Sequence, residues 1–259
     1  MTRLMAPAKL TLNLAVTGVR ADGYHQLRSE MVSLSLADEL VFTEGEDQLT
    51  VAAEPDTRAE GLGGAAHNLV TRALAAVGRR AGVHLVKRIP LGGGLGGGST
   101  DAAAVLRWAG CTDPETALAL GSDVPFSVVG GRALVEGTGE RVTPLPFERR
   151  RFVLLIPPFG VVTSKVYAAW DALAERDQSG EDGNALTTAA LRVEPRLMPW
   201  RDALEKLTGR RPVLAGSGST WFVEEGPSEA GTERTWLVLG DQRARIVRAH
   251  TVPAGWDGT

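Results

Sequence analysis

The sequence predicts an α+β protein built from two domains, and three observations carry this prediction. Residues 8–18 (AKLTLNLAVTG) alternate apolar and polar side chains, which is the period of a strand with one buried face. Residues 92–98 form a glycine run between an apolar strand and an alanine-rich helix. At residues 144–151 the composition changes to PLPFERRR, and a new apolar strand follows. We therefore expect an N-terminal domain with a mixed sheet and helices over residues 1–147, and a smaller C-terminal α/β sandwich domain over residues 148–259.

The first strands and the first helix follow from their periodicity. Residues 8–18 predict one strand, residues 29–45 predict another strand or a pair of strands, and residues 48–55 predict a further one. Residues 67–82 carry apolar side chains at helical spacing and end in Gly82, a residue type that favours a helix C-cap. Residues 83–90 predict the strand that leads into the glycine run. These elements imply an early mixed or antiparallel sheet.

The later elements are predicted in the same way. A helix over residues 99–110 follows the glycine run, with Ser99, Thr100 or Asp101 available as its N-cap. The C-terminal half predicts a strand at residues 152–158, helices at residues 185–191 and 201–207, and a strand–turn–strand unit at residues 211–225.

Composition and charge exclude several classes of partner. The net charge of −3 gives no general basic surface for nucleic acid. The single cysteine excludes an internal disulfide and a multi-cysteine zinc site, as is typical of a reducing compartment. No stretch approaches the ~20 apolar residues of a transmembrane helix. We therefore expect a cytoplasmic protein that binds neither nucleic acid nor a membrane.

The glycine run predicts a phosphate-binding loop. Six of its seven residues are glycine, so main-chain amides can approach an anion closely, and the helix that follows adds unpaired N–H groups and its positive dipole end. Gly92, Gly94 and Gly97 satisfy GxGxxG, but no ribose-binding acidic residue follows in the spacing of a dinucleotide site. Ser99 stands where a Walker A loop needs lysine, and the HRD and DFG motifs of protein kinases are absent.

Five stretches, in order along nearly the whole chain, resemble the GHMP kinases, a family of small-molecule kinases. They are APAKLTLNLAVTGVRADGYHQL, IPLGGGLGGGSTDAAA, GSDVPFSVVGGRALVEGTGE, PPFGVVTSKVY and LAGSGSTWF. Within the family, the doubled GGG and the STDAAA after it look most like the kinases that phosphorylate the 2-hydroxyl of diphosphocytidyl methylerythritol in non-mevalonate isoprenoid synthesis. The resemblance implies a two-domain GHMP kinase fold, ATP and Mg²⁺ as cofactors, a small-molecule substrate, and a monomer or homodimer.

The resemblance also implies two catalytic residues. Asp123, in GSDVPF, matches the aspartate that accepts the proton of the substrate hydroxyl. Lys9, in APAKL, matches the lysine beside it, which favours the ionised carboxylate and stabilises charge as it develops. From the residues alone, Asp123 could be a turn or helix-cap residue, and Lys9 could extend along its strand into solvent.

The binding residues follow from the same resemblance. The contacts to the ATP phosphates are Gly92, Gly93, Gly94, Leu95, Gly96, Gly97, Gly98, Ser99 and Thr100, and Ser99 is also a candidate Mg²⁺ ligand. Asn68 and Lys87 match residues of the purine pocket, although helix capping and a surface charge are the alternatives for them.

For the second substrate, Tyr24, His25 and Tyr167 match residues that hold cytosine by stacking and by edge hydrogen bonds. Gly216, Ser217 and Gly218 match a backbone nest near the substrate phosphates, with a tight inter-strand turn as the alternative.

The chain departs from the family pattern in ways that keep rival functions open. Thr11 stands where the family usually has asparagine, so the positioning of the substrate hydroxyl differs there. The segment that precedes Asp123 is also shorter than the corresponding segment of the family, by about one helical segment. Two alternatives follow: a GHMP kinase acting on another small alcohol, such as a homoserine-like compound or a sugar, and a non-catalytic nucleotide-binding module.

Overall fold

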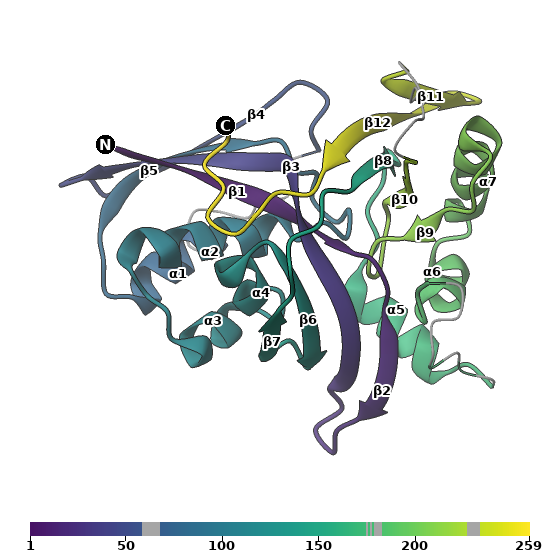
Figure 1. The fold of residues 1–259 in the computed structure, drawn as a ribbon, viewed down its shortest axis with the longest axis horizontal. Helices are drawn as coiled ribbons and strands as arrows, with labels where there is room; N and C mark the ends of the chain where they lie inside the picture. The colour runs from purple at the N-terminus through teal and green to yellow at the C-terminus, as the bar shows by residue number, and fades with distance from the viewer. Residues whose placement is uncertain (59–67, 175, 177, 179–182, 227–233) are drawn as a thin grey trace.

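The computed structural model describes residues 1–58, 68–174, 176, 178, 183–226 and 234–259, and it contains two sheets (Figure 1). The strands of the first sheet are β1 (Thr2–Thr11), β2 (Ala15–Val19), β3 (His25–Glu44), β4 (Leu49–Ala53), β5 (Ala81–Lys87), β6 (Arg132–Gly137) and β7 (Arg141–Pro144). The 20-residue β3 is its centre, because β1, β2, β5 and β6 all pair with it. Among the strands of this sheet that the structure describes, only β4 and β5 pair in parallel. The prediction of a mixed sheet is confirmed.

Four helices cover one face of this sheet (Figure 1). They are α1 (Leu69–Ala76), α2 (Gly97–Ala109), α3 (Pro114–Leu120) and α4 (Val124–Val129). Residues 100–106 of α2 are all buried, and the three alanines among them let the helix lie close to β1 and to its neighbouring helices. The start of α2 is thereby held against the sheet.

The second sheet has the strand order β11-β12-β8-β10-β9 and is antiparallel throughout. Its strands are β8 (Arg151–Ile156), β9 (Val213–Leu214), β10 (Trp221–Glu224), β11 (Trp236–Leu239) and β12 (Gln242–His250). Helices α5 (Thr163–Asp171), α6 (Thr187–Val193) and α7 (Leu197–Thr208) lie beside it (Figure 1). The domain division near residue 147 stays a prediction.

The core of the second sheet includes residues from the start of the chain. Leu14 and Val16 are buried in one cluster with Trp170, Leu186 and Trp200 of the helical layer. Leu14 also bonds through its main chain to residues 183 and 185. In the opposite direction, the C-terminal tail returns to the first sheet, where the Val252 amide donates to the Ser33 carbonyl at 2.9 Å. Both sheets are therefore completed by segments distant in sequence.

Three predicted boundaries are wrong. The strand expected over residues 8–18 is interrupted after Thr11, because the Glu30 amide donates to the Asn13 side chain and the Leu14 main chain bonds to residues 183 and 185 instead of β3. Helix α1 ends at Val77, and Gly82 lies in β5. Helix α2 begins inside the glycine run with Gly96 at its N-cap, so the predicted caps Ser99, Thr100 and Asp101 lie within the helix. His67, in the predicted first helix, lies outside the described residues.

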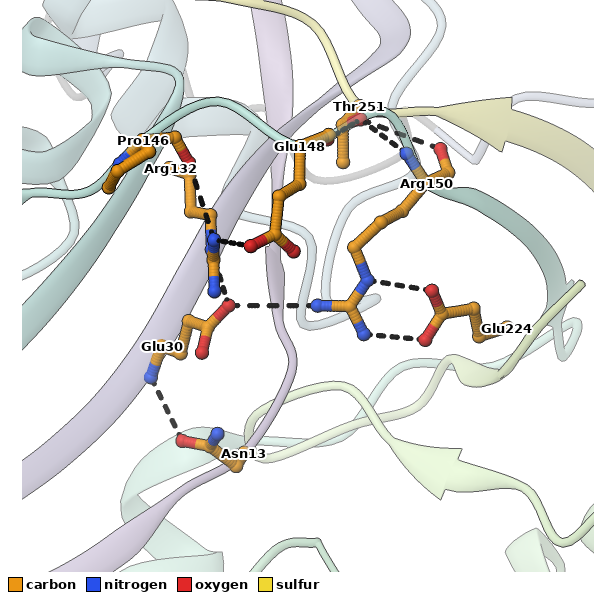
Figure 2. A network of polar contacts seen from close by, with 8 residues as sticks. All are labelled: Asn13, Glu30, Arg132, Pro146, Glu148, Arg150, Glu224 and Thr251. Atoms are coloured by element: carbon orange, nitrogen blue, oxygen red, sulfur yellow. Dashed lines mark hydrogen bonds and ion pairs between the residues drawn. The ribbon is translucent and has the colours of Figure 1, made fainter.

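A network of charged side chains holds the connection between the two sheets (Figure 2). Glu30 of β3 accepts from Arg132 at 2.8 Å and lies 3.6 Å from Arg150, which pairs in turn with Glu224 of β10. The Glu30 amide donates to the Asn13 side chain at 2.9 Å. Because Glu30, Arg132 and Arg150 are only partly exposed, their contacts fix geometry more strongly than fully exposed pairs do. The network holds the short break between β1 and β2 against β3.

Beneath the start of α2 lies a buried charge cluster. The Lys87 ammonium at the end of β5 bonds Asp38 of β3 and, at 2.6 Å, Asp101 of α2. None of the three is more than 2% exposed. One ammonium cannot neutralise two buried carboxylates, so burial raises the pKa of Asp101 to about 8 and keeps a proton on it. Asp38 also accepts from the amides of Arg88 and Ile89, so it is the better stabilised carboxylate.

Asp101→Asn is expected to remove one component of the pH dependence of stability. The pKa of Asp101 is about 8 in the folded protein and near 3.8 in a free aspartate, so the folded state binds the extra proton between these values. The free energy of unfolding of the parent protein, relative to the variant, should therefore fall as pH rises from 5 to 8, by up to about 1.4 kcal/mol per pH unit, and level off above 9. Urea unfolding at each pH measures this. The exposed Asp241→Asn is the control, and a constant difference between parent and Asp101→Asn would contradict the assignment.

Candidate active site

The glycine run forms a loop held on two sides by main-chain hydrogen bonds. The Lys9 amide donates to the Leu95 carbonyl at 3.0 Å, and the amides of Ser219 and Thr220 donate to Gly92 and Gly93 at 3.3 and 3.1 Å. At Gly94, φ is +77°, and a Cβ would lie 2.1 Å from the Ala215 carbonyl oxygen. Only glycine fits there, because both the backbone conformation and the close approach exclude a side chain.

The loop ends at an open helix N-terminus. Gly96, the N-cap of α2, has φ +69° and offers no side-chain acceptor to the first amides of the helix. Gly97, Gly98 and Ser99 begin the helix and line a cavity. Free amides and the positive end of a 13-residue helix form a site for an anion.

Lys9 and Asp123 meet at this cavity. The Lys9 ammonium lies 3.4 Å from the Asp123 carboxylate and donates to the Thr11 hydroxyl at 3.1 Å. Lys9 is only 6% exposed, so the alternative of a lysine extended into solvent is wrong. Asp123 does occupy the N-cap position of α4, but its side chain makes no capping hydrogen bond. The carboxylate is therefore directed to the lysine and the cavity.

A residue that the sequence did not single out supports Asp123. Arg107 of α2 donates to the Ser127 carbonyl in α4 and to the Met5 carbonyl in β1. Ser127 in turn donates its hydroxyl to the Asp123 carbonyl at 2.8 Å. Burial lowers the pKa of Arg107 to about 10, so it remains a cation at neutral pH. These bonds fix the start of α4 relative to the strand that carries Lys9.

Aromatic side chains line the far end of the cavity. Tyr24 lies 61% exposed at the tip of the β2–β3 hairpin. The His25 ring lies 4.6 Å from the Tyr167 ring, and its Nε2 lies 2.9 Å from an Asp171 carboxylate oxygen. Burial, together with the negative charge of Asp123, raises the pKa of Tyr167 well above its ordinary value, so its phenol keeps its proton.

The turn between β9 and β10 forms the opposite wall. Gly216 and Gly218 have φ of +58° and +89°. The Asn184 side chain donates to the carbonyls of Leu214 and Gly216 at 2.8 and 2.6 Å. Ser217 bonds through its hydroxyl to Thr163 of α5 at 2.8 Å. The turn is therefore rigid and is held at the start of α5.

Most of the predicted residues line one cavity of about 890 Å³. They are Lys9, Thr11, Tyr24, His25, Gly92, Gly93, Gly94, Gly96, Gly97, Gly98, Ser99, Asp123, Tyr167, Gly216 and Ser217. The sequence reasoning missed Asp22, Thr163 and Asp171, which also line it. Asp171 follows Tyr167 by one helical turn, and this spacing could have indicated it.

Five predicted residues do not line this cavity. Leu95 is buried in the core, Thr100 donates its hydroxyl to the Pro7 carbonyl, and Gly218 packs on Leu214. Asn68 caps α1 by accepting from the Val70 amide at 2.9 Å, as its helix-capping alternative predicts. Lys87 is completely buried, so the alternative of a surface charge is wrong. The roles assigned to these five in binding stay predictions.

The described residues contain neither a membrane-spanning helix nor a cluster of metal-ligating side chains. In that part of the chain, no helix combines the length and apolar character needed to span a bilayer. Nor do three or more His, Cys, Asp or Glu side chains gather there as metal ligands.

Comparisons with known proteins identify the family of the chain. A family model for the GHMP kinases N terminal domain matches residues 64–131. The chain is 42% identical to a 4-diphosphocytidyl-2-C-methyl-D-erythritol kinase of Dehalococcoides mccartyi, over 86% of this chain and 89% of that protein. It is 37% identical to a kinase of the same name from a Polaromonas species, over 97% and 92%.

Solved structures support the fold. A crystal structure of 4-(cytidine 5'-diphospho)-2C-methyl-D-erythritol kinase matches with a TM-score of 0.64 at 33% identity, over 85% of this chain and 89% of that one. A mevalonate kinase crystal structure matches with a TM-score of 0.59 at 12% identity, over 98% and 100%, which is a likeness of fold alone. The predicted GHMP kinase fold is confirmed, and the chain belongs to the GHMP kinases and, within them, to the 4-diphosphocytidyl-2-C-methyl-D-erythritol kinase family.

Proposed function

We propose that the chain phosphorylates the 2-hydroxyl of 4-diphosphocytidyl-2-C-methyl-D-erythritol with ATP, in the non-mevalonate pathway to isoprenoid precursors. The observation that carries this is the contact of the Lys9 ammonium with the Asp123 carboxylate at 3.4 Å, between a phosphate-type loop and an aromatic pocket. Phosphoryl transfer needs in-line positioning, neutralisation of phosphate charge and control of one proton, and this cavity offers a group for each.

The glycine loop fits the phosphates of ATP. A Cβ at Gly94 or Gly96 would lie within 2.7 Å of other atoms, so the loop is built to bring bare main chain to the cavity. The amides of residues 96–99 would hold the phosphates, and bound ATP supplies the γ-phosphoryl group that is transferred. Ser99 offers a hydroxyl oxygen at the cavity wall, a ligand type that Mg²⁺ accepts beside phosphate oxygens.

The protein's own part in the chemistry lies with three side chains. Asp123 accepts the proton of the attacking hydroxyl at its carboxylate. Lys9, held by the Thr11 hydroxyl, orients that carboxylate and offsets negative charge on the acceptor oxygen. The Gly216–Gly218 turn faces the same ammonium, because a Cβ at Gly216 would lie 3.3 Å from the Lys9 nitrogen. The amides of Gly216 and Ser217 would hold the substrate phosphates, since the Gly218 amide donates to the Ala215 carbonyl.

The aromatic end of the cavity favours a cytidyl substrate over a smaller alcohol. Tyr24, His25 and Tyr167 provide ring faces and polar edges suited to a nucleobase. A homoserine-like compound or a sugar would leave this end unfilled. The Lys9–Asp123 contact disfavours a non-catalytic nucleotide-binding module, since mere binding needs no such pair.

The function is tested by ADP release from the purified chain with ATP, Mg²⁺ and a panel of alcohols. The cytidyl compound should give the highest kcat/KM by at least about a hundredfold, because only it fills the aromatic end. The position of the new phosphate is read by ³¹P NMR. A higher kcat/KM for homoserine, mevalonate or a sugar would overturn the proposed substrate, and no turnover with any alcohol would favour the nucleotide-binding module.

Tyr24→Ala is expected to raise KM for the cytidyl substrate about tenfold or more while changing kcat by less than about threefold. The reason is that a stacked base loses roughly 1–3 kcal/mol without its aromatic partner, whereas Tyr24 is remote from the transferred proton. Steady-state kinetics at saturating ATP measures both constants. Phe147→Ala, at an exposed aromatic residue that does not line the cavity, is the matched control. An unchanged KM would remove Tyr24 from the substrate site.

A further inference from the structure

The orientation of the His25 ring is fixed from two sides. The ring lies 4.6 Å from Tyr167, tilted by 32°, and 5.5 Å from Trp170, nearly edge-on. Both aromatic residues belong to α5. The His25 side chain is only 9% exposed although it lines the cavity. The imidazole therefore presents a defined edge to whatever enters the cavity.

Asp171 determines which nitrogen of that ring carries the proton. Its carboxylate oxygen lies 2.9 Å from Nε2. A carboxylate only accepts hydrogen bonds, so Nε2 is the donor, and in the neutral imidazole Nδ1 then carries a lone pair. The pair joins residues 146 positions apart in the sequence.

The lone pair of Nδ1 is available to a ligand. No hydrogen bond to Nδ1 is formed within the described part of the chain, and Nδ1 is not one of the fully buried polar atoms that lack a partner there. Nδ1 is therefore not fully buried, and the residue that carries it lines the cavity. An acceptor in this position matches a ligand that offers an N–H group.

Stability gives no reason for a carboxylate at residue 171. Asp171 is the last residue of α5, where a negative charge meets the negative end of the helix dipole. Its side chain is 46% exposed, and within the described residues its carboxylate bonds only to His25. The Asp171 carboxylate therefore lowers the stability of α5, and its bond to His25 is what it contributes within the described residues.

We propose that Asp171 is a positioning residue that makes the site specific for cytosine, an inference that rests on the proposed function. By holding the proton on Nε2, it leaves Nδ1 as an acceptor for the exocyclic amino group of cytosine. Uracil carries a carbonyl oxygen at that position, so two lone pairs would face each other. Its only ring donor, N3–H, lies one position away, and the base would have to shift within the cavity to use it.

The test compares the affinities of CDP and UDP for the parent chain, Asp171→Asn and a control. Calorimetry is done with a saturating non-hydrolysable ATP analogue, so that the nucleotide loop is filled. The parent should bind CDP at least about tenfold more tightly than UDP, the size expected for one mismatched hydrogen bond. In Asp171→Asn the amide can donate to Nε2, so Nδ1 can carry the proton and bond the uracil oxygen. The preference of Asp171→Asn for CDP over UDP should therefore fall to about threefold or less, because this variant binds UDP more tightly than the parent does.

Asp202→Asn, on the exposed side of α7 and outside the cavity, should leave the preference unchanged. If Asp171 had a merely structural role, Asp171→Asn would weaken the binding of CDP and of UDP equally. If the preference of Asp171→Asn for CDP stays within about twofold of the parent's, the inference is overturned but the proposed function is not. A parent chain that phosphorylates the cytidyl substrate yet binds UDP as well as CDP also overturns only the inference. If the parent chain neither prefers CDP over UDP nor phosphorylates the cytidyl substrate, the inference and the proposed function are both overturned.

Discussion

Asp123→Asn is expected to lower kcat about a hundredfold or more while leaving KM for ATP within about threefold, since general-base catalysis contributes that much to turnover. Asparagine has the same shape, but its amide cannot take the proton of the acceptor hydroxyl. The side chain makes no capping hydrogen bond, so α4 should begin at the same residue, and the melting temperature should fall only because the buried Lys9 ammonium loses its carboxylate partner. A coupled ADP-release assay measures kcat.

Asp202→Asn serves again as the matched control, because it removes an exposed carboxylate remote from the cavity. Turnover of Asp123→Asn within about threefold of the parent would show that the proton goes elsewhere, and the assignment of Asp123 would be wrong. A chain inactive both before and after the substitution would instead favour the nucleotide-binding module.

Gly94→Ala should abolish most activity by moving the phosphate loop. Its new Cβ would lie 2.1 Å from the Ala215 oxygen and 3.0 Å from the Gly218 oxygen, both main-chain atoms that cannot rotate away. Loop and turn must then separate, and a displacement of about 1 Å in a catalytic site costs roughly a hundredfold in rate. We expect kcat/KM to fall at least about a hundredfold, measured by the same assay, and the melting temperature to fall with it.

Gly110→Ala separates this clash from backbone strain. Gly110 ends the same helix with a similar φ of +69°, and a Cβ there would meet nothing within 4 Å. That variant should lose only about 1–2 kcal/mol of stability from the left-handed conformation and keep its activity. Equal activity losses in the two variants would contradict a steric role for Gly94.

The sequence predicts much of the first sheet because apolar residues alternate along its strands, although in β1 and the middle of β3 consecutive residues are buried and both faces are covered. The predicted start of α2 is wrong for a physical reason. Local rules favour Ser99, Thr100 or Asp101 as a cap, yet the helix begins at Gly97 after Gly96, an N-cap without a side chain, which leaves its first amides open to the cavity. Local preference and observed structure differ at the site where a ligand would supply the missing acceptor.

The site itself could be predicted only where residues lie in continuous motifs. The glycine loop, Lys9 and Asp123 belong to such stretches, but the 3.4 Å contact of the last two depends on the fold. Lys87 could not be identified as buried, because its carboxylate partners lie 49 and 14 residues away and leave no local pattern. The pairing of His25 with Asp171 is invisible for the same reason.

The burial of Leu14 and Val16 under the helices of the second sheet has a consequence for synthesis of the chain. The ribosome makes these two residues near the start, whereas Leu186 and Trp200, which cover them, emerge much later. Throughout that interval the nascent polypeptide exposes apolar side chains that the finished fold buries. A translation product that stops before α6 keeps these side chains exposed and is a substrate for aggregation or proteolysis.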